Sequence, residues 1–110
     1  CLNMEEAGEF CKIIGDTPRN RVLEFFIEGR EMDFGVGDVA REIGLNRLTT
    51  YGVMKELVNN EFLIPSRKVG KGQLYRLNMK KLEVAMLIQL FNNVLKRIVN
   101  EYKHEVEVET

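Results

Sequence analysis

Gly44 separates two segments of helical periodicity, and this arrangement constrains the fold of the chain more than any other feature of the sequence. The segment before it places three apolar residues on one helical face: Val39, Ala40 and Ile43. The segment after it starts at Asn46, a favourable N-cap, and is predicted to run to about residue 60. Its apolar stripe occupies positions 50, 53, 54, 57 and 58, the spacing of one buried face. Two such segments around a glycine predict a helix, a sharp turn and a second helix packed on the first.

A glycine-bearing hairpin is predicted beyond the second helix. Residues 62–65 and 73–77 have the composition of short strands, and Val69-Gly70-Lys71-Gly72 lies between them. Pro65 has no N–H group to donate to a strand ladder, so it is expected at an edge or near the end of its strand. The hairpin therefore follows the two helices directly.

The segments on either side are predicted to be mainly helical. Residues 2–14 have the pattern of a short helix. Thr17-Pro18 is a strong start for the next helix, because threonine caps free N–H groups and proline fits the first helical position. A short extended segment is predicted at 34–36, and a long last helix, capped by Asn78, over about residues 79–102.

The residues on both sides of Gly44 resemble a known family pattern. Residues 39–51, VAREIGLNRLTTY, are similar to the helix-turn-helix of transcription regulators, and residues 60–63, NEFL, resemble its usual lead into a wing. Residues 67–78, RKVGKGQLYRLN, resemble the wing of MarR- and ArsR-like winged helix regulators. The resemblance covers roughly residues 17–81. It implies a mainly α fold with a small β-hairpin, namely a winged helix-turn-helix with a long C-terminal helix.

Periodicity and resemblance together divide the chain into four parts. Residues 1–16 are an N-terminal helical extension, 17–81 the winged helix DNA-binding domain, 82–103 a C-terminal dimerisation helix and 104–110 an acidic tail. The tail alternates valine with glutamate, which also fits an edge strand, although a frayed tail is the simpler expectation.

Charge is segregated along the chain although the formal net charge is only −1. Residues 1–43 contain ten acidic and five basic residues, whereas residues 44–81 contain eight basic and two acidic ones. Residues 82–110 return to an acidic surplus, with five acidic and three basic residues. A central block of net charge +6 is expected where one face of a protein meets phosphate groups.

The second helix of the pair is the predicted recognition helix, because it buries one stripe and presents the other to the major groove. Arg47 is suited to a guanine edge, and Leu48 or Thr49 to a thymine methyl group. Tyr51 and Lys55 are suited to phosphates. The predicted DNA contacts on this helix are Asn46, Arg47, Leu48, Thr49, Tyr51 and Lys55.

The wing supplies a second group of predicted DNA contacts. These residues are Arg67, Lys68, Lys71 and Arg76. A lysine between two glycines reaches a flanking phosphate or the minor groove without a rigid fit. The alternative is a solvated hairpin whose charges keep its edges from aggregating.

Two residues depart from the family pattern. Gly52 stands in the recognition helix where such regulators usually carry a polar or basic side chain, and glycine there costs up to about 1 kcal/mol relative to alanine. A close approach to DNA or a packed neighbour would explain it. Leu48 is apolar at a position expected to be exposed.

The predicted last helix is apolar around most of its circumference. Such a helix must be buried on more than one side, and in a chain of 110 residues a second subunit is the usual cover. The resemblance implies the same, since these regulators commonly dimerise through terminal helices. The expected dimer interface consists of Leu87, Phe91, Val94, Leu95, Ile98 and Tyr102. The alternative is that the helix predicted at 2–14 covers the second side within the monomer.

These features predict a dimeric transcription regulator that binds double-stranded DNA sequence-specifically. The alternative is a winged-helix module that binds other proteins in transcription or chromosome organisation, which the near-neutral net charge favours. A small-molecule effector in a hydrophobic dimer crevice is compatible with the first reading. No signal-peptide pattern opens the sequence and no apolar stretch is long enough to span a bilayer, so a cytoplasmic protein without membrane contact is expected.

The residue types argue against an enzyme, a cofactor or a metal site. His104 is the single histidine, and Ser66 has no local context of an activated nucleophile. Gly70-Lys71-Gly72 lacks the spacing of a phosphate-binding loop. Metal sensing would need clustered Cys, His and carboxylate groups. Cys11 is expected to be a small buried apolar residue, with a redox-sensing thiol as the alternative.

Overall fold

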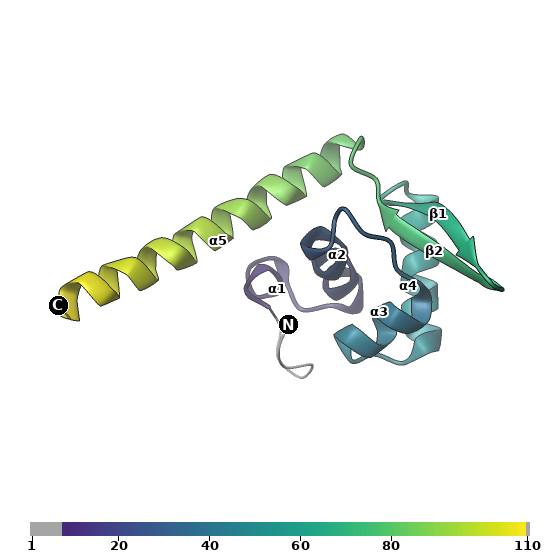
Figure 1. Cartoon of the computed structure of the whole chain (residues 1–110), viewed down its shortest axis with the longest axis horizontal. Coiled ribbons are helices and arrows are strands. Elements are labelled where there is room, and N and C mark those ends of the chain that lie inside the picture. The colour runs from purple at the N-terminus through teal and green to yellow at the C-terminus, as the bar shows by residue number, and fades with distance from the viewer. Residues whose placement is uncertain (1–7, 110) are drawn as a thin grey trace.

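The computed structural model of the chain describes the backbone of residues 8–109 and the side chains of residues 8–102. These residues form five helices and one hairpin: α1 (Glu9–Ile14), α2 (Pro18–Glu28), α3 (Val36–Ile43), α4 (Arg47–Asn59), β1 (Leu63–Val69), β2 (Gly72–Leu77) and α5 (Leu82–Glu109). In Figure 1 the hairpin projects from one end of a body built from α1 to α4, and α5 runs past α1 toward the opposite end. The extents are 55 × 30 × 24 Å, because α5 extends beyond the body.

The helices begin and end where their capping residues predict. The side-chain oxygen of Thr17 accepts the N–H of Asn20 at 3.1 Å, and Pro18 occupies the first turn of α2. Gly44 ends α3 with a φ of 72°, a left-handed conformation that glycine adopts without steric cost. The predicted helix, turn and second helix are therefore confirmed in α3 and α4.

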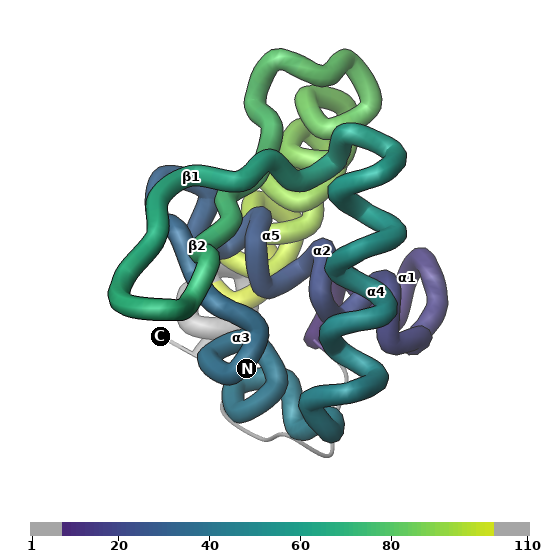
Figure 2. Tube along the Cα trace, turned by 90° about the vertical axis from the view of Figure 1, so that its right-hand side faces the viewer, coloured from purple at the N-terminus to yellow at the C-terminus, as the bar shows by residue number. Residues whose placement is uncertain are grey.

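The core lies where α2 meets the other elements. Val22, Leu23, Phe26 and Ile27 of α2 are buried, and side chains from each of the other elements surround them. The surrounding buried residues are Phe10, Val39, Ile43, Met54, Leu57, Leu63, Leu77, Val84 and Phe91. Viewed from the hairpin end, α3 and α4 lie beside the hairpin while α5 recedes behind it (Figure 2). The core thus holds α4 and the hairpin on one end of the molecule.

The hairpin is longer than the sequence predicts. Its strands pair antiparallel from Leu63 opposite Leu77 to Val69 opposite Gly72, with a shift in register between Pro65 and Lys68. The shift follows the proline, which cannot donate to the ladder. The predicted short extended segment is also present, because Phe34 and Tyr75 exchange backbone hydrogen bonds of 2.8 and 2.9 Å.

The ends of the predicted last helix require correction. Asn78 does not cap it: its side chain donates to the carbonyl of Glu61 and accepts the N–H of Lys80, so the chain turns and α5 begins at Leu82. At the other end α5 continues through Glu109, where a frayed tail or an edge strand was expected. No glycine or proline interrupts residues 82–109, and extending a helix adds one hydrogen bond per residue without a new nucleus.

The N-terminal helix is shorter in the described residues than its sequence pattern. The prediction covers residues 2–14, and α1 spans Glu9–Ile14, with residues 2–7 lying outside the described part of the chain. Phe10 and Cys11 of α1 are buried. The ring of Phe10 packs edge-on against that of Phe91, with centroids 5.9 Å apart. α1 therefore covers part of α5 within a single chain.

Candidate nucleic-acid interface

The two faces of α4 divide as the sequence predicts. Thr50, Met54 and Leu57 are buried, and positions 53 and 58 are half-buried against the core. The opposite face is exposed along its length. Its exposed residues are Arg47, Leu48, Thr49, Tyr51, Gly52 and Lys55. The whole outward face of α4 is therefore free to meet a partner.

Two side-chain hydrogen bonds fix the start of α4. The side-chain oxygen of Asn46 accepts the N–H of Thr49 at 2.7 Å. The hydroxyl of Thr50 donates to the carbonyl of Asn46 at 2.9 Å. Asn46 therefore has a structural role as N-cap, which places Arg47 at the exposed first position of the helix.

The wing carries its cations on an exposed hairpin. Gly70 has a φ of 61°, which lets the chain turn tightly and leaves Lys71 at the tip. Lys68 and Arg76 lie on the two strands, and all three side chains are exposed. The hairpin projects away from the body beside α4, so these cations extend the exposed face of α4 (Figure 1).

Arg67 differs from the other cations of the wing because it has a partner. Its Nε donates to the carboxylate of Asp33 at 3.0 Å, and the hydroxyl of Ser66 donates to the same carboxylate at 2.8 Å. The hydrogen bonds from Ser66 and then Arg67 lower the pKa of Asp33 below its ordinary value. The sequence gives no sign of this link, because Asp33 lies more than 30 residues before the wing in an irregular segment.

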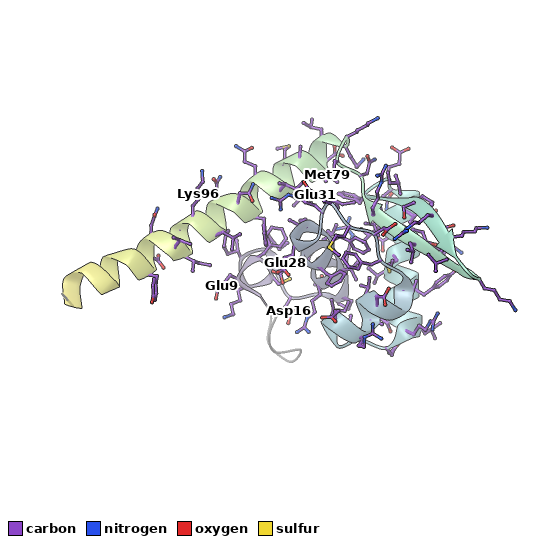
Figure 3. All side chains as sticks on the ribbon, viewed as in Figure 1. Glu9, Asp16, Glu28, Glu31, Met79 and Lys96 are labelled. Atoms are coloured by element: carbon purple, nitrogen blue, oxygen red, sulfur yellow. The ribbon has the colours of Figure 1, made fainter. Side chains whose placement is uncertain are left out.

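Ion pairing separates this face from the rest of the surface. Each of Lys12, Arg19, Arg21, Arg41, Lys81 and Arg97 lies within 4.0 Å of a carboxylate. Five cations of α4 and the wing have no ion pair with any described residue: Arg47, Lys55, Lys68, Lys71 and Arg76. Lys80 and Lys96 share this property, but Lys96 lies on α5 and points away from the body (Figure 3).

The acidic residues lie elsewhere. Glu9, Asp16 and Glu28 gather at the α1 and α2 end of the molecule, away from the wing (Figure 3). The charge segregation read along the sequence is therefore a segregation in space. A surface of unpaired cations attracts polyanions and is favoured by their counterion release.

An open groove lies between α4 and the wing. Its volume is about 620 Å³, and α4, the wing and the start of α3 line it. Among its lining residues are Val36, Arg47, Leu48, Tyr51, Lys71, Leu74 and Tyr75. Its walls are mostly apolar, while Arg47 and Lys71 supply positive charge from opposite sides. Such a surface suits an anionic partner that also offers apolar groups.

The predicted dimer interface on α5 divides into two groups. Phe91 is only 8% exposed because the core and α1 cover it, so its assignment to a subunit interface is wrong. Leu87 and Val94 are half-buried, whereas Leu95, Ile98 and Tyr102 are exposed. Positions 84, 88, 91, 95, 98 and 102 follow each other at helical spacing. One apolar stripe is thus covered by the body over its first half and exposed over its second.

Cys11 is buried, as expected for a small apolar residue. Burial, followed by the charges of Glu24 and Asp16, raises the pKa of its thiol to about 12. The thiol therefore stays protonated at neutral pH, and the protonated form is a poor nucleophile. This environment favours the packing role over redox sensing.

Two further searches concern the described residues alone. They contain no group of three or more His, Cys, Asp or Glu side chains arranged to hold a metal ion. No helix among them is both long enough and apolar enough to cross a membrane. The side chain of His104 lies outside the described set.

No protein-family model matches the sequence, and no curated protein is significantly similar to it. Solved structures do match the fold. The ferric uptake regulator of Francisella tularensis aligns with a TM-score of 0.52 at 18% identity, over 60% of this chain and 54% of that one. The adhesin competence repressor AdcR of Streptococcus pyogenes aligns with a TM-score of 0.59 at 11% identity, over 80% and 65%. MepR, a transcription regulator of a Staphylococcus aureus multidrug efflux pump, aligns with a TM-score of 0.60 at 8% identity, over 88% and 70%.

These likenesses establish the fold. The chain is a winged helix-turn-helix, mainly helical with one two-stranded antiparallel hairpin. The chain spans just over half the length of the ferric uptake regulator and just under two thirds of AdcR. All three matched proteins are named as regulators or repressors. The expected fold is confirmed, whereas membership of a MarR- or ArsR-like family stays a prediction.

Proposed function

We propose that this protein binds double-stranded DNA sequence-specifically and regulates transcription. The observation that carries the proposal is the set of five cations on α4 and the wing that have no ion pair with a described residue. Cations elsewhere on the body are mostly paired, so this face has positive charge available for phosphates.

In the proposed complex α4 enters the major groove and the wing lies on flanking DNA. The outward face of α4 is unobstructed, and a helix fits the width of the major groove. Arg47, at the first turn, is positioned to donate two hydrogen bonds to a guanine edge. Tyr51 and Lys55 on α4, and Lys68, Lys71 and Arg76 on the wing, bind phosphates and fix the register.

A second copy of the chain completes this arrangement. The exposed part of the α5 stripe, with Leu95, Ile98 and Tyr102, requires a cover that the described residues do not supply. Pairing of two such stripes buries them and gives a two-fold axis. That symmetry sets two recognition helices about 34 Å apart, the distance of one DNA turn, and implies a palindromic site.

A protein-binding module is the second candidate. The mostly apolar groove between α4 and the wing, together with the exposed Leu48 and Tyr51, favours it, because aromatic and apolar residues are enriched in the centres of protein interfaces. The two candidates differ in their dependence on charge. DNA binding requires the cations of α4 and the wing, whereas an apolar protein interface tolerates their loss.

Charge reversal tests the proposal. In a gel-shift assay, the triple variant Arg47→Glu, Lys55→Glu, Lys71→Glu is expected to bind duplex DNA at least about tenfold more weakly than the unchanged protein. The matched control reverses Lys12, Lys96 and Arg97, which lie on α1 and the outer part of α5, and should bind normally. Equal DNA binding by the test variant would contradict the proposed interface and favour the protein-binding module.

A further inference from the structure

Gly52 has no role inside the chain that requires glycine. It lies in the middle of α4, its φ is not positive, and a Cβ built on it meets nothing within 4 Å. A packed neighbour, one of the two explanations that the sequence allows, is therefore excluded among the described residues. Glycine is one of the weakest helix formers, so its presence on an exposed helical face calls for a partner outside the chain.

Apolar side chains flank this glycine on the outward face. Leu48 lies one turn before it and is 81% exposed, and the adjacent Tyr51 is 50% exposed. Residues four apart lie above one another on a helix, so Gly52 leaves a gap in the row that Leu48 starts. The result is a notch with a bare backbone floor and apolar walls, which opens onto the groove lined by Leu48 and Tyr51.

The surroundings of this notch define what enters it. Arg47 lines the same groove from α4, and Lys71 lines it from the wing. Neither has an ion pair with a described residue. The occupant is therefore a small apolar group carried on a polyanion. In the major groove of duplex DNA, the 5-methyl group of thymine is the one apolar group at a base edge.

We propose that Leu48, Tyr51 and Gly52 form a notch that reads the methyl group of one thymine in each half-site. This inference rests on the proposed DNA binding and adds a specificity determinant to it. Alanine at position 52 would fill the notch, so glycine permits the approach of the base edge. Leu48 supplies the apolar contact.

The test removes the methyl group and nothing else. A duplex enriched from random DNA by the purified protein is resynthesised with deoxyuridine at each thymine in turn. At one position of each half-site the unchanged protein is expected to lose about fourfold in affinity, the value of one buried methyl group. Leu48→Ala should bind thymine and uracil duplexes equally, and Leu48→Met should restore the preference.

Gly52→Ala separates recognition from a structural role. The variant should melt at a higher temperature than the unchanged protein, because alanine is the better helix former, and should bind the thymine duplex more weakly. Binding that stays sequence-specific and is unaffected by every thymine-to-uracil change would overturn the notch and leave the DNA-binding proposal intact. No enrichment of any duplex would overturn both.

Discussion

At the scale of single residues, Asp33 joins the wing to the body. Its carboxylate accepts hydrogen bonds from Ser66 and Arg67 at the base of β1. Arg67 is therefore engaged within the protein, although its side chain is 69% exposed. Its predicted contact with DNA requires it to share or exchange this carboxylate for a phosphate.

The lowered pKa of Asp33 predicts a pH dependence of stability. Because the folded-state pKa lies below the unfolded value of about 3.9, the ionised carboxylate stabilises the fold above that pH. This contribution is lost as the pH falls through the folded-state pKa. Urea unfolding between pH 7 and pH 3 should therefore show a smaller acid loss of stability in Asp33→Asn than in the unchanged protein. Parallel pH profiles for the two proteins would contradict the link.

Cys11 gives a prediction at the other end of the pH scale. With a pKa of about 12, the thiol should resist iodoacetamide at pH 8 in the folded protein and react once urea unfolds the chain. The experiment uses Cys1→Ser, so that the label reports Cys11 alone. Since the unfolded thiol ionises near 8.5, stability should also fall as the pH rises above about 9. Rapid labelling of the folded protein would revive the redox-sensing alternative.

Sequence reasoning succeeds at this scale where the cause is local. Thr17, Gly44 and Asn46 cap or end helices through contacts within a few residues, so their roles follow from residue type and spacing. The Asp33 link joins residues more than 30 positions apart and has no local pattern. The empty space beside Gly52 likewise becomes visible only when the surrounding helices are in place.

At the scale of elements, α5 has two different environments along one stripe. Its periodicity predicts burial, but the sequence does not say whether α1 or a second subunit provides the cover. The structure assigns Phe91 to the first cover, through its contact with Phe10. Ile98 lies two turns further on the same stripe and is exposed. The error over Phe91 arose because a tertiary contact with α1 is invisible in the helical pattern.

Substitutions in the two halves of α5 should therefore have different effects. Ile98→Glu is expected to give the mass of one chain in light scattering, with unchanged thermal stability of the isolated domain. Phe91→Ala is expected to lower the free energy of unfolding by about 3 kcal/mol, because it opens a cavity beside Phe10. A monomeric unchanged protein, or a dimer that survives Ile98→Glu, would contradict the proposed subunit interface.

At the scale of the whole molecule, a net charge of −1 hides a polar distribution of charge. Acidic residues lie at the α1 and α2 end, and unpaired cations lie on α4 and the wing. Such a molecule should approach DNA with one face and lose affinity as salt rises. The logarithm of the binding constant should fall by about 0.9 for each phosphate neutralised, per unit rise in the logarithm of the salt concentration. A flat salt profile would contradict phosphate contacts.

The most direct measurement is selection of bound duplexes from random DNA by the purified protein, with its mass in solution determined alongside. The account predicts enrichment of a palindrome whose half-sites are about one DNA turn apart, together with the mass of two chains. The Arg47→Glu, Lys55→Glu, Lys71→Glu variant should enrich nothing under the same conditions. If the unchanged protein enriches no sequence, the central claim is wrong, and the face formed by α4 and the wing serves a protein partner instead.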